Sequence, residues 1–314
     1  MVRRESKQSA FVEAFVNMPQ AESVLDKVDR CINWNPIRNK IERLYRKGGA
    51  GRPAFPAVTM FKVLLLQGWY DLSDPAAEEA IADRFSFRRF LGLSLEEKTP
   101  DHSTIHRFRD RIAPIAERLF AEVNRQLEAK ALILKKGTLV DASLIQAAAR
   151  PSAGDSAPTD PDARWGGKEN KPVFGYKAHV GMDAGSELIR RADMTPANVH
   201  DSRCFEAMLS GDEEAAYADK AYDSRKHSDW LRSQGIMNFV LMRGRRGHPL
   251  SPLASACNRS MSRVRQGVER FFGTVKRIYR WRRCRYYSLT RNRSNLFVLC
   301  TCYNLKRAVK LGAA

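Results

Sequence analysis

The hydrophobic pattern of this sequence changes once, a little before its midpoint, and that change constrains the fold more than any other feature. In the first part of the chain, apolar residues recur with helical spacing, as in Phe55 to Leu72 and Pro75 to Leu93. In the second part they form short runs rich in Val, Ile, Leu, Tyr and Phe, which are typical of strands. We therefore expect an α/β protein, with an all-helical N-terminal domain over 1–132 and a mixed α/β domain over 133–314.

Further helices are predicted in the N-terminal part. Ala10 to Met18 and Asn35 to Arg46 carry the same apolar spacing. Asp101 or Ser103 is a suitable N-cap for a helix that could continue to about Lys130.

The first turns of that last helix carry Arg107, Arg109 and Arg111. Arginines in this position could grip DNA phosphates, or they could form a solvated basic face. The sequence leaves both interpretations open.

Five segments of the second part match the strand pattern. They are KGTLVDASLIQAA, VFGYKAHVGMD, ELIRRADMT, EAAYADKAY and MNFVLMR. Helices are expected in VHDSRCFEAMLS and SRKHSDWLRSQG, in a long stretch after Ser251, and from about Asn295. The segment 150–172 is dense in Pro, Gly, Ser and Asp, which predicts an exposed, largely disordered loop.

The positive charge is concentrated in the last third of the chain. The net charge is +19, and residues 221–314 hold 21 Lys and Arg against three acids, a net +18. Such a surface suits a polyanionic partner, either nucleic acid or an acidic membrane. No apolar run is long enough to span a bilayer and no signal-peptide pattern is present, so we expect a cytoplasmic protein. The six cysteines lack a zinc-site spacing and are expected to be buried thiols.

Three acids are candidates for catalysis. Asp141 and Asp219 interrupt apolar strands, in TLVDASLI and AAYADKAYDS. A carboxylate there is costly unless it is paired or bound to a metal, although each alone could be a strand-end acid hydrogen-bonded to a turn. The third is Glu269, one of only three acids in the basic last third.

Glu269 shares one side of a predicted helix with two cations. Arg265 and Lys276 lie four residues before and seven residues after it, so the three side chains fall on one face. The opposite flank offers apolar side chains for packing, namely Val264, Val268, Phe271 and Val275.

Together these segments resemble the DDE transposases of bacterial insertion sequences, especially the insertion-sequence-five family. The resemblance rests on TLVDASLI, FGYKAHVGMD, TPANVHDS, YADKAYDS and RQGVERFFGTVK, in that order. The stretches GRPAFPAVTMFKVLLLQGWYDLSD and RFSFRRFLGLSLEEKTPDHSTIHRFRDRI resemble the helical N-terminal domain of the same family. One departure is Ser262, which stands where related transposases often have a tyrosine.

The resemblance implies an RNase H-like fold in which Asp141, Asp219 and Glu269 bind two Mg²⁺ ions, with Mn²⁺ as a substitute. Two such ions suit the cutting of DNA and the joining of its freed 3′ ends to target DNA. The implied partners are double-stranded element ends and target DNA, bound by a homodimer in the bacterial cytoplasm. Asp193, Asp183 and Asp223 are the reserve acids.

The predicted DNA contacts are basic residues near the second and third acids. They are Arg265, Lys276, Lys220, Arg280, Arg282, Arg283 and Arg285. Aromatic residues interleave with them at Tyr279, Trp281, Tyr286 and Tyr287, where they could stack on exposed bases or face the core. His200 and Asp201 are expected to cap a helix. Two other functions stay open: a metal nuclease without strand transfer, and a non-catalytic DNA-binding regulator.

Overall fold

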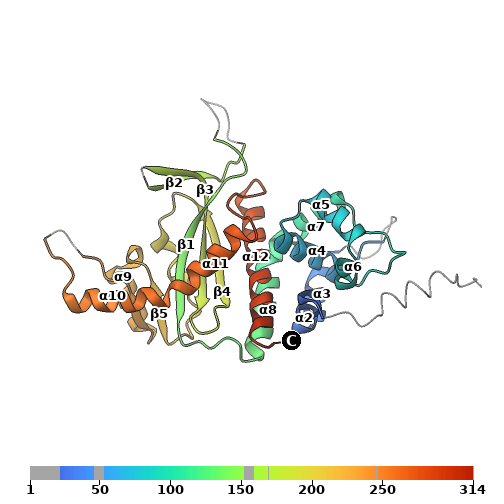
Figure 1. Cartoon of the computed structure of the whole chain (residues 1–314). Helices are drawn as coiled ribbons and strands as arrows, with labels where there is room; N and C mark the ends of the chain where they lie inside the picture. Colours follow the sequence, from blue (N-terminus) through green and yellow to red (C-terminus); the bar gives the residue numbers. More distant parts are fainter. Residues whose placement is uncertain (1–21, 46–52, 152–158, 169, 245–246, 314) are drawn as a thin grey trace, which may run out of the picture.

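The structure, a computed structural model, describes residues 22–45, 53–151, 159–168, 170–244 and 247–313. Figure 1 shows the N-terminal helices gathered at one end of an elongated molecule, with a mixed sheet toward the other end. The C-terminal helix α12 (Leu289–Lys310) runs between them. The helix predicted in Ala10 to Met18 lies outside the described residues.

The N-terminal part is helical, as predicted. Its elements are α2 (Val24–Cys31), α3 (Asn35–Glu42), α4 (Ala57–Tyr70), α5 (Asp74–Asp83), α6 (Phe85–Leu91), α7 (His102–Ile112), the 3₁₀ turn η1 (Ala113–Ile115) and α8 (Ala116–Ala129). Helix α4 is buried on nearly all sides, so the other helices pack around it. Asp101 is the N-cap of α7, where its carboxylate accepts a 2.6 Å hydrogen bond from the Thr104 amide. The expected continuation to Lys130 is interrupted at η1, which contains Pro114.

Arg109 does not belong to a DNA-facing or solvated surface. Its side chain is buried and forms an ion pair with Asp74, and it also donates a 3.1 Å hydrogen bond to Gln67. The interpretation of Arg107, Arg109 and Arg111 as one basic face is therefore wrong for its middle member.

The second part forms a mixed six-stranded sheet in the order β2-β3-β1-β5-β6, with β4 paired to β3. The strands are β1 (Thr138–Gln146), β2 (Arg164–Lys168), β3 (Lys171–Asp183), β4 (Ile189–Pro196), β5 (Ala215–Ala218) and β6 (Met237–Val240). Strands β1, β5 and β6 run parallel, whereas β2, β3 and β4 pair antiparallel. All five predicted strands are confirmed.

Strand β2 corrects the expectation of a disordered loop over 150–172. Its residues pair with the start of β3, from Arg164 opposite Gly175 to Lys168 opposite Lys171. The loop prediction rested on the Pro, Gly, Ser and Asp content of 150–172, but Gly166 and Gly167 belong to the strand. Gly167 takes a φ of +100°, a conformation that favours glycine. Residues 152–158 and 169 lie outside the described part of the chain.

The helices of the second part differ from the expectation in three places. VHDSRCFEAMLS forms two short 3₁₀ helices, η2 (Asp201–Cys204) and η3 (Glu206–Met208), and α12 begins before Asn295. The long helix after Ser251 is two helices, α10 (Pro252–Val264) and α11 (Gln266–Arg277), which meet at Arg265. The predicted α9 (Arg225–Ser233) is confirmed, and it follows η4 (Lys220–Tyr222).

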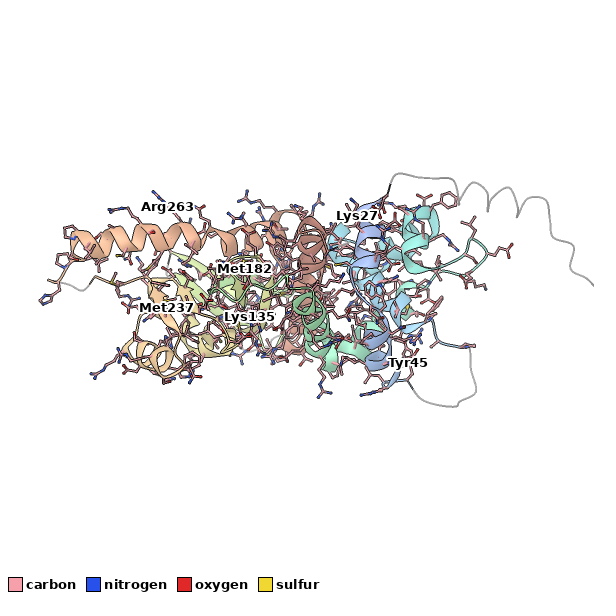
Figure 2. All side chains as sticks on the ribbon, turned by 90° about the horizontal axis from the view of Figure 1, so that it is seen from below. Lys27, Tyr45, Lys135, Met182, Met237 and Arg263 are labelled. Carbon is pink, nitrogen blue, oxygen red and sulfur yellow. The ribbon has the colours of Figure 1, made fainter. Side chains whose placement is uncertain are left out.

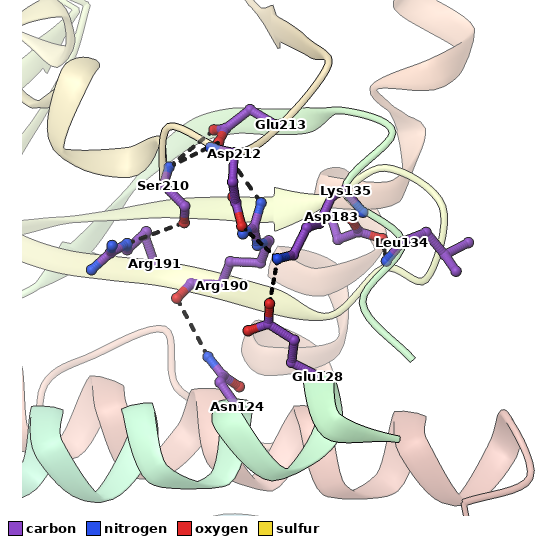
Figure 3. Close-up of polar contacts among 10 residues, drawn as sticks. All are labelled: Asn124, Glu128, Leu134, Lys135, Asp183, Arg190, Arg191, Ser210, Asp212 and Glu213. Carbon is purple, nitrogen blue, oxygen red and sulfur yellow. Dashed lines mark hydrogen bonds and ion pairs between the residues drawn. The ribbon is translucent and has the colours of Figure 1, made fainter. Parts of the chain in front are cut away.

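One continuous apolar core joins the two parts of the molecule. It includes side chains from α4, α8, β1, β3, α11 and α12. A polar network reinforces the contact of α8 with the sheet (Figure 3): Lys135 forms ion pairs with Glu128 and Asp212, and Asn124 donates to the Arg190 carbonyl. A second apolar cluster, with Val140, Phe205 and Tyr222, covers the other face of β1 and β5.

Helix α10 is the exception to this packing. None of its residues is buried, and Figure 2 shows Arg263 on the outer side of the molecule. Across the described residues, no helix is long and apolar enough to cross a membrane. Five of the six cysteines are buried and all six are free thiols, as expected, with Cys257 partly exposed.

Candidate active site

The parallel pairing of β1 and β5 brings two of the candidate acids together. Val140 lies opposite Ala218, the last residue of β5, so the next step of the register sets Asp141 beside Asp219. Neighbouring strands lie about 4.8 Å apart, and residues paired in this way point to the same face of the sheet. The two carboxylates, 78 positions apart in sequence, therefore meet where β5 ends.

A guanidinium group lies between these two carboxylates. Arg265 Nη2 is 3.5 Å from Asp141 Oδ1, and Arg265 Nη1 is 3.8 Å from Asp219 Oδ1. The Arg265 side chain is only 10% exposed, and its Nε atom is buried without a hydrogen-bond partner. Its position at the junction of α10 and α11 directs it into the site rather than to an outer helix face.

The acids differ in their environment. The side chain of Asp141 is 23% exposed, and burial raises its pKa to about 6 although Arg265 acts in the opposite direction. Asp219 and Asp201 raise the pKa of Asp141 further through their negative charge. Asp219 is 44% exposed and its carboxylate accepts a 2.7 Å hydrogen bond from the Lys220 amide. The site is therefore rich in negative charge and short of positive charge.

Glu269 lies one helical turn beyond Arg265, in the first turn of α11. Its side chain is exposed and makes no hydrogen bond or ion pair within the described part of the protein. Nor do the described residues contain three or more His, Cys, Asp or Glu side chains arranged to hold a metal ion. The structure thus brings together Asp141 and Asp219, and leaves Glu269 nearby in sequence but unengaged.

Lys276 contacts the strand that carries Asp141. Its Nζ donates to Ser143 Oγ at 2.6 Å and to the Leu144 carbonyl at 3.0 Å. Burial lowers the pKa of Lys276, and the charge of Arg282 adds to this. Lys276 therefore fixes α11 across the face of β1 on which Asp141 and Ser143 lie.

The basic segment after α11 is only partly available to a partner. Arg280 and Arg282 are exposed. Arg283 donates to the Ala147 carbonyl, and Arg285 forms an ion pair with Asp71.

The aromatic residues of this segment correct one expectation. Tyr279 and Trp281 are 2% and 1% exposed and line a pocket with Leu64 and Gly68 of α4, so they cannot stack on DNA bases in this structure. Tyr287 is the most exposed of the four, at 49%. On the opposite flank of α11, Val268, Phe271 and Val275 are buried as expected, whereas Val264 is 41% exposed.

The three reserve acids have structural partners. Asp183 is fully buried and accepts from the Lys135 and Ser186 amides. Asp193 pairs with Arg293, and Asp223 accepts from the Arg243 amide. Lys220, in contrast, is exposed beside Asp219.

Sequence reasoning missed a polar group on the opposite face of the sheet. Lys177 forms a 2.6 Å ion pair with Asp201, and His179 Nε2 lies 2.9 Å from Thr195 Oγ1. Burial lowers the pKa of His179 to about 4. Two polar residues at alternate positions of an apolar strand were the available signal. The expected capping is confirmed for His200, which is the N-cap of η2.

Two family models match this chain. One, described as "Transposase DDE domain", matches residues 133–305, which is more than half of the chain and contains all three candidate acids. The other, described as "Transposase domain (DUF772)", matches residues 13–111 of the helical part.

One solved structure matches this chain in the comparison of folds. It is a piggyBac transposase in a synaptic complex with hairpin DNA, 10% identical, with a TM-score of 0.45. The match covers 93% of this chain and 74% of that chain.

Proposed function

This chain belongs to the transposases with a DDE domain, and we propose that it binds the ends of its own insertion element, cleaves them and joins the 3′ ends to target DNA. Its mixed α/β architecture, with a helical region before the sheet, is that of an RNase H-like DDE transposase. The order and spacing of its motifs support a place in the insertion-sequence-five family.

The observation that carries this proposal is the convergence of Asp141 and Asp219 on one cation. Both carboxylates approach Arg265 within 3.8 Å, at the carboxyl end of a parallel strand. Arg265 alone does not offset the burial of Asp141, whose pKa is raised to about 6. Carboxylate oxygens are the ligands that Mg²⁺ prefers, and a divalent cation would relieve this excess of negative charge. The residues present therefore fit a Mg²⁺ or Mn²⁺ site.

We assign the catalytic carboxylates as Asp141, Asp219 and Glu269. When bound, two divalent ions would supply Lewis-acid stabilisation of the attacking and leaving oxygens of an in-line displacement. Asp141, within β1, and Asp219, directly after β5, would provide a preformed pair of oxygen ligands. Glu269 provides the third from α11, whose backbone is held by buried Val268 and Phe271.

The cations around the site are assigned to DNA in two groups. Arg265 and Lys276 lie against the acid-bearing strand, where each could exchange a protein contact for a phosphate oxygen. Lys220, Arg280 and Arg282 are exposed and are proposed to contact the DNA backbone. Arg283 and Arg285 would contribute only those donors that their contacts within the chain leave unused.

The test is cleavage and joining of labelled element-end DNA in Mg²⁺ or Mn²⁺. Asp219→Ala and Glu269→Ala should each abolish cleavage and retain DNA binding, because metal ligands contribute to the chemical step more than to binding of the phosphate backbone. Asp229→Ala is the matched control, since Asp229 is an exposed acid on α9 that pairs with the neighbouring Arg225 and Arg232.

The outcomes separate the competing functions. Cleaved ends without joined products would indicate a nuclease, and binding without cleavage by the unaltered protein would indicate a regulator. Sedimentation of the protein with element-end DNA tests the proposed homodimer. Cleavage by Asp219→Ala at the rate of the unaltered protein would remove Asp219 from the site.

A further inference from the structure

A large aromatic side chain stands exposed on the hairpin formed by β2 and the start of β3. Trp165 is 54% exposed, and its ring lies 5.6 Å from that of Phe174 on the paired strand. Figure 1 shows this hairpin projecting beyond the rest of the sheet. An indole group exposed to this extent has apolar surface left for a partner.

The strand register places Trp165 on the same face of the sheet as Asp141. Trp165 lies opposite Phe174, and the Ala147 amide donates to the Phe174 carbonyl at 2.9 Å. Asp141 and Ala147 are six positions apart on one strand, so their side chains fall on one face. At about 3.3 Å per residue, the row of Trp165 lies ~20 Å from the row of Asp141.

The face between these two rows is closed, because Ile145, Tyr176 and Ala178 are fully buried in the core. Positive charge lies instead along the edge of β1 beyond the end of β5. Lys276 contacts β1 at Ser143, and Arg283 lies beside Gln146, one residue before Ala147. Arg164 and Lys171 are exposed on the hairpin itself, and neither has an acidic partner among the described residues. A phosphate backbone that left the carboxylates along this edge would therefore meet cations before it reached the indole.

The hairpin holds Trp165 in a defined position. A side chain at Gly166 would place its Cβ 2.1 Å from the Ala197 carbonyl oxygen, so the backbone there packs directly on the segment after β4. Gly167 needs its positive φ for the turn into β3. Gly166 faces the segment at Ala197. Because neighbouring strand residues point to opposite faces, the indole of Trp165 is directed away from that segment.

We propose that Trp165 stacks on an unpaired base of the DNA strand that extends from the carboxylates along this edge of β1 to the hairpin. The inference rests on the proposed function, because the partner is the DNA whose cleavage site lies at Asp141 and Asp219. An aromatic ring flanked by cations fits a base and its adjoining phosphates. The contacted base lies about three to six nucleotides from the scissile phosphate, according to how extended the strand is over ~20 Å.

Two DNA probes and two variants of the full-length protein test the proposal. The probes are a short duplex with a single-stranded extension and the same duplex with blunt ends. Trp165→Ala should weaken binding to the extended probe about 10- to 100-fold, whereas Trp165→Phe should lose only about threefold. The affinity for the blunt probe should stay within about threefold for both variants. Trp165 is exposed, so both variants should melt at the temperature of the unaltered protein.

Fluorescence gives an independent readout. The extended probe should quench the tryptophan emission of the unaltered protein and of Trp230→Phe, a control with a partly exposed indole on α9. It should quench the emission of Trp165→Phe much less. A fluorescent adenine analogue, moved along the extension, should report the greatest stacking about three to six nucleotides from the duplex.

Two results would overturn the stacking role. One is equal binding of the extended probe by the unaltered protein and by Trp165→Ala. The other is a Trp165→Ala variant that loses self-association and keeps its DNA affinity, which would make the hairpin a contact between copies of this chain. Failure of the proposed function is separate: cleavage would be absent from the unaltered protein while the Trp165-dependent quenching persisted.

Discussion

Replacing Asp141 by asparagine should make the metal-free protein more stable. Burial raises the pKa of Asp141 to about 6, so the folded protein holds this proton more tightly than the unfolded chain does. Ionisation of Asp141 therefore lowers the stability of the fold as the pH rises. Below the unfolded-state pKa of 3.8 the carboxyl group is neutral in both states and carries no penalty, and above about pH 6 the full penalty of a buried charge applies.

The magnitude follows from the two pKa values. Raising a carboxyl pKa from 3.8 to about 6 destabilises the fold by about 3 kcal/mol once the group is fully ionised, and by about half of that at pH 5. Asparagine has nearly the same shape and no charge. The stability gained by Asp141→Asn should therefore be about 1.4 kcal/mol larger at about pH 8 than at about pH 5. The attraction of Arg265 is already contained in these values, because it acts against burial in setting the pKa of about 6.

Urea unfolding at the two pH values, with a chelator present, measures this difference directly. Asp219→Asn is the control, because Asp219 is 44% exposed and asparagine keeps an acceptor for the Lys220 amide. The control should change stability by less than about 0.5 kcal/mol at either pH. A gain for Asp141→Asn that is equal at both pH values, or larger at pH 5, would refute the electrostatic argument.

Three further outcomes are expected. Arg109→Ala should lower the free energy of unfolding by about 3–5 kcal/mol, because it leaves Asp74 without its buried partner. Arg107→Ala, at an exposed position, is the control and should change the free energy of unfolding little in the same urea titration. Affinity for random duplex should fall ~10³–10⁵-fold between about 50 and 200 mM salt if ~6–10 phosphates are contacted. Replacing Arg259 and Arg263 of α10 by alanine together should reduce the slope of that salt titration by about two, provided that both contact phosphates.

The strands and most helices could be predicted from the sequence because their signal is local. The run around Asp141 forms β1 since its β-branched and aliphatic residues suit a buried strand. Strand β2 was missed because the segment 150–172 is dense in Pro, Gly, Ser and Asp. The structural reason for Gly166 and Gly167 lies elsewhere in the fold, at the Ala197 backbone and the turn into β3. These are tertiary contacts, which cannot be inferred from the residues next to Gly166 and Gly167 in sequence.

The aromatic and basic segment after α11 illustrates the same limit. Tyr279 and Trp281 alternate with arginines, which is equally compatible with stacking on bases and with burial. Both line a pocket together with Leu64 and Gly68 of α4, more than two hundred positions earlier in the chain. Deletion of this segment would thus remove core side chains, so only point changes at exposed arginines can test its role in DNA binding.

The junction at Arg265 determines how the third carboxylate can reach the other two. The sequence predicts one helix with Arg265, Glu269 and Lys276 on one face, and the structure ends α10 and begins α11 at Arg265. Arg265 keeps right-handed helical angles, φ −66° and ψ −12°, so Glu269 still follows it by one turn. Helix α11 is anchored by buried Val268, Phe271 and Val275, whereas α10 has no buried residue. A conformational change that brings the Glu269 carboxylate to Asp141 and Asp219 can therefore involve the Glu269 side chain and α10. It leaves the backbone of α11 in place.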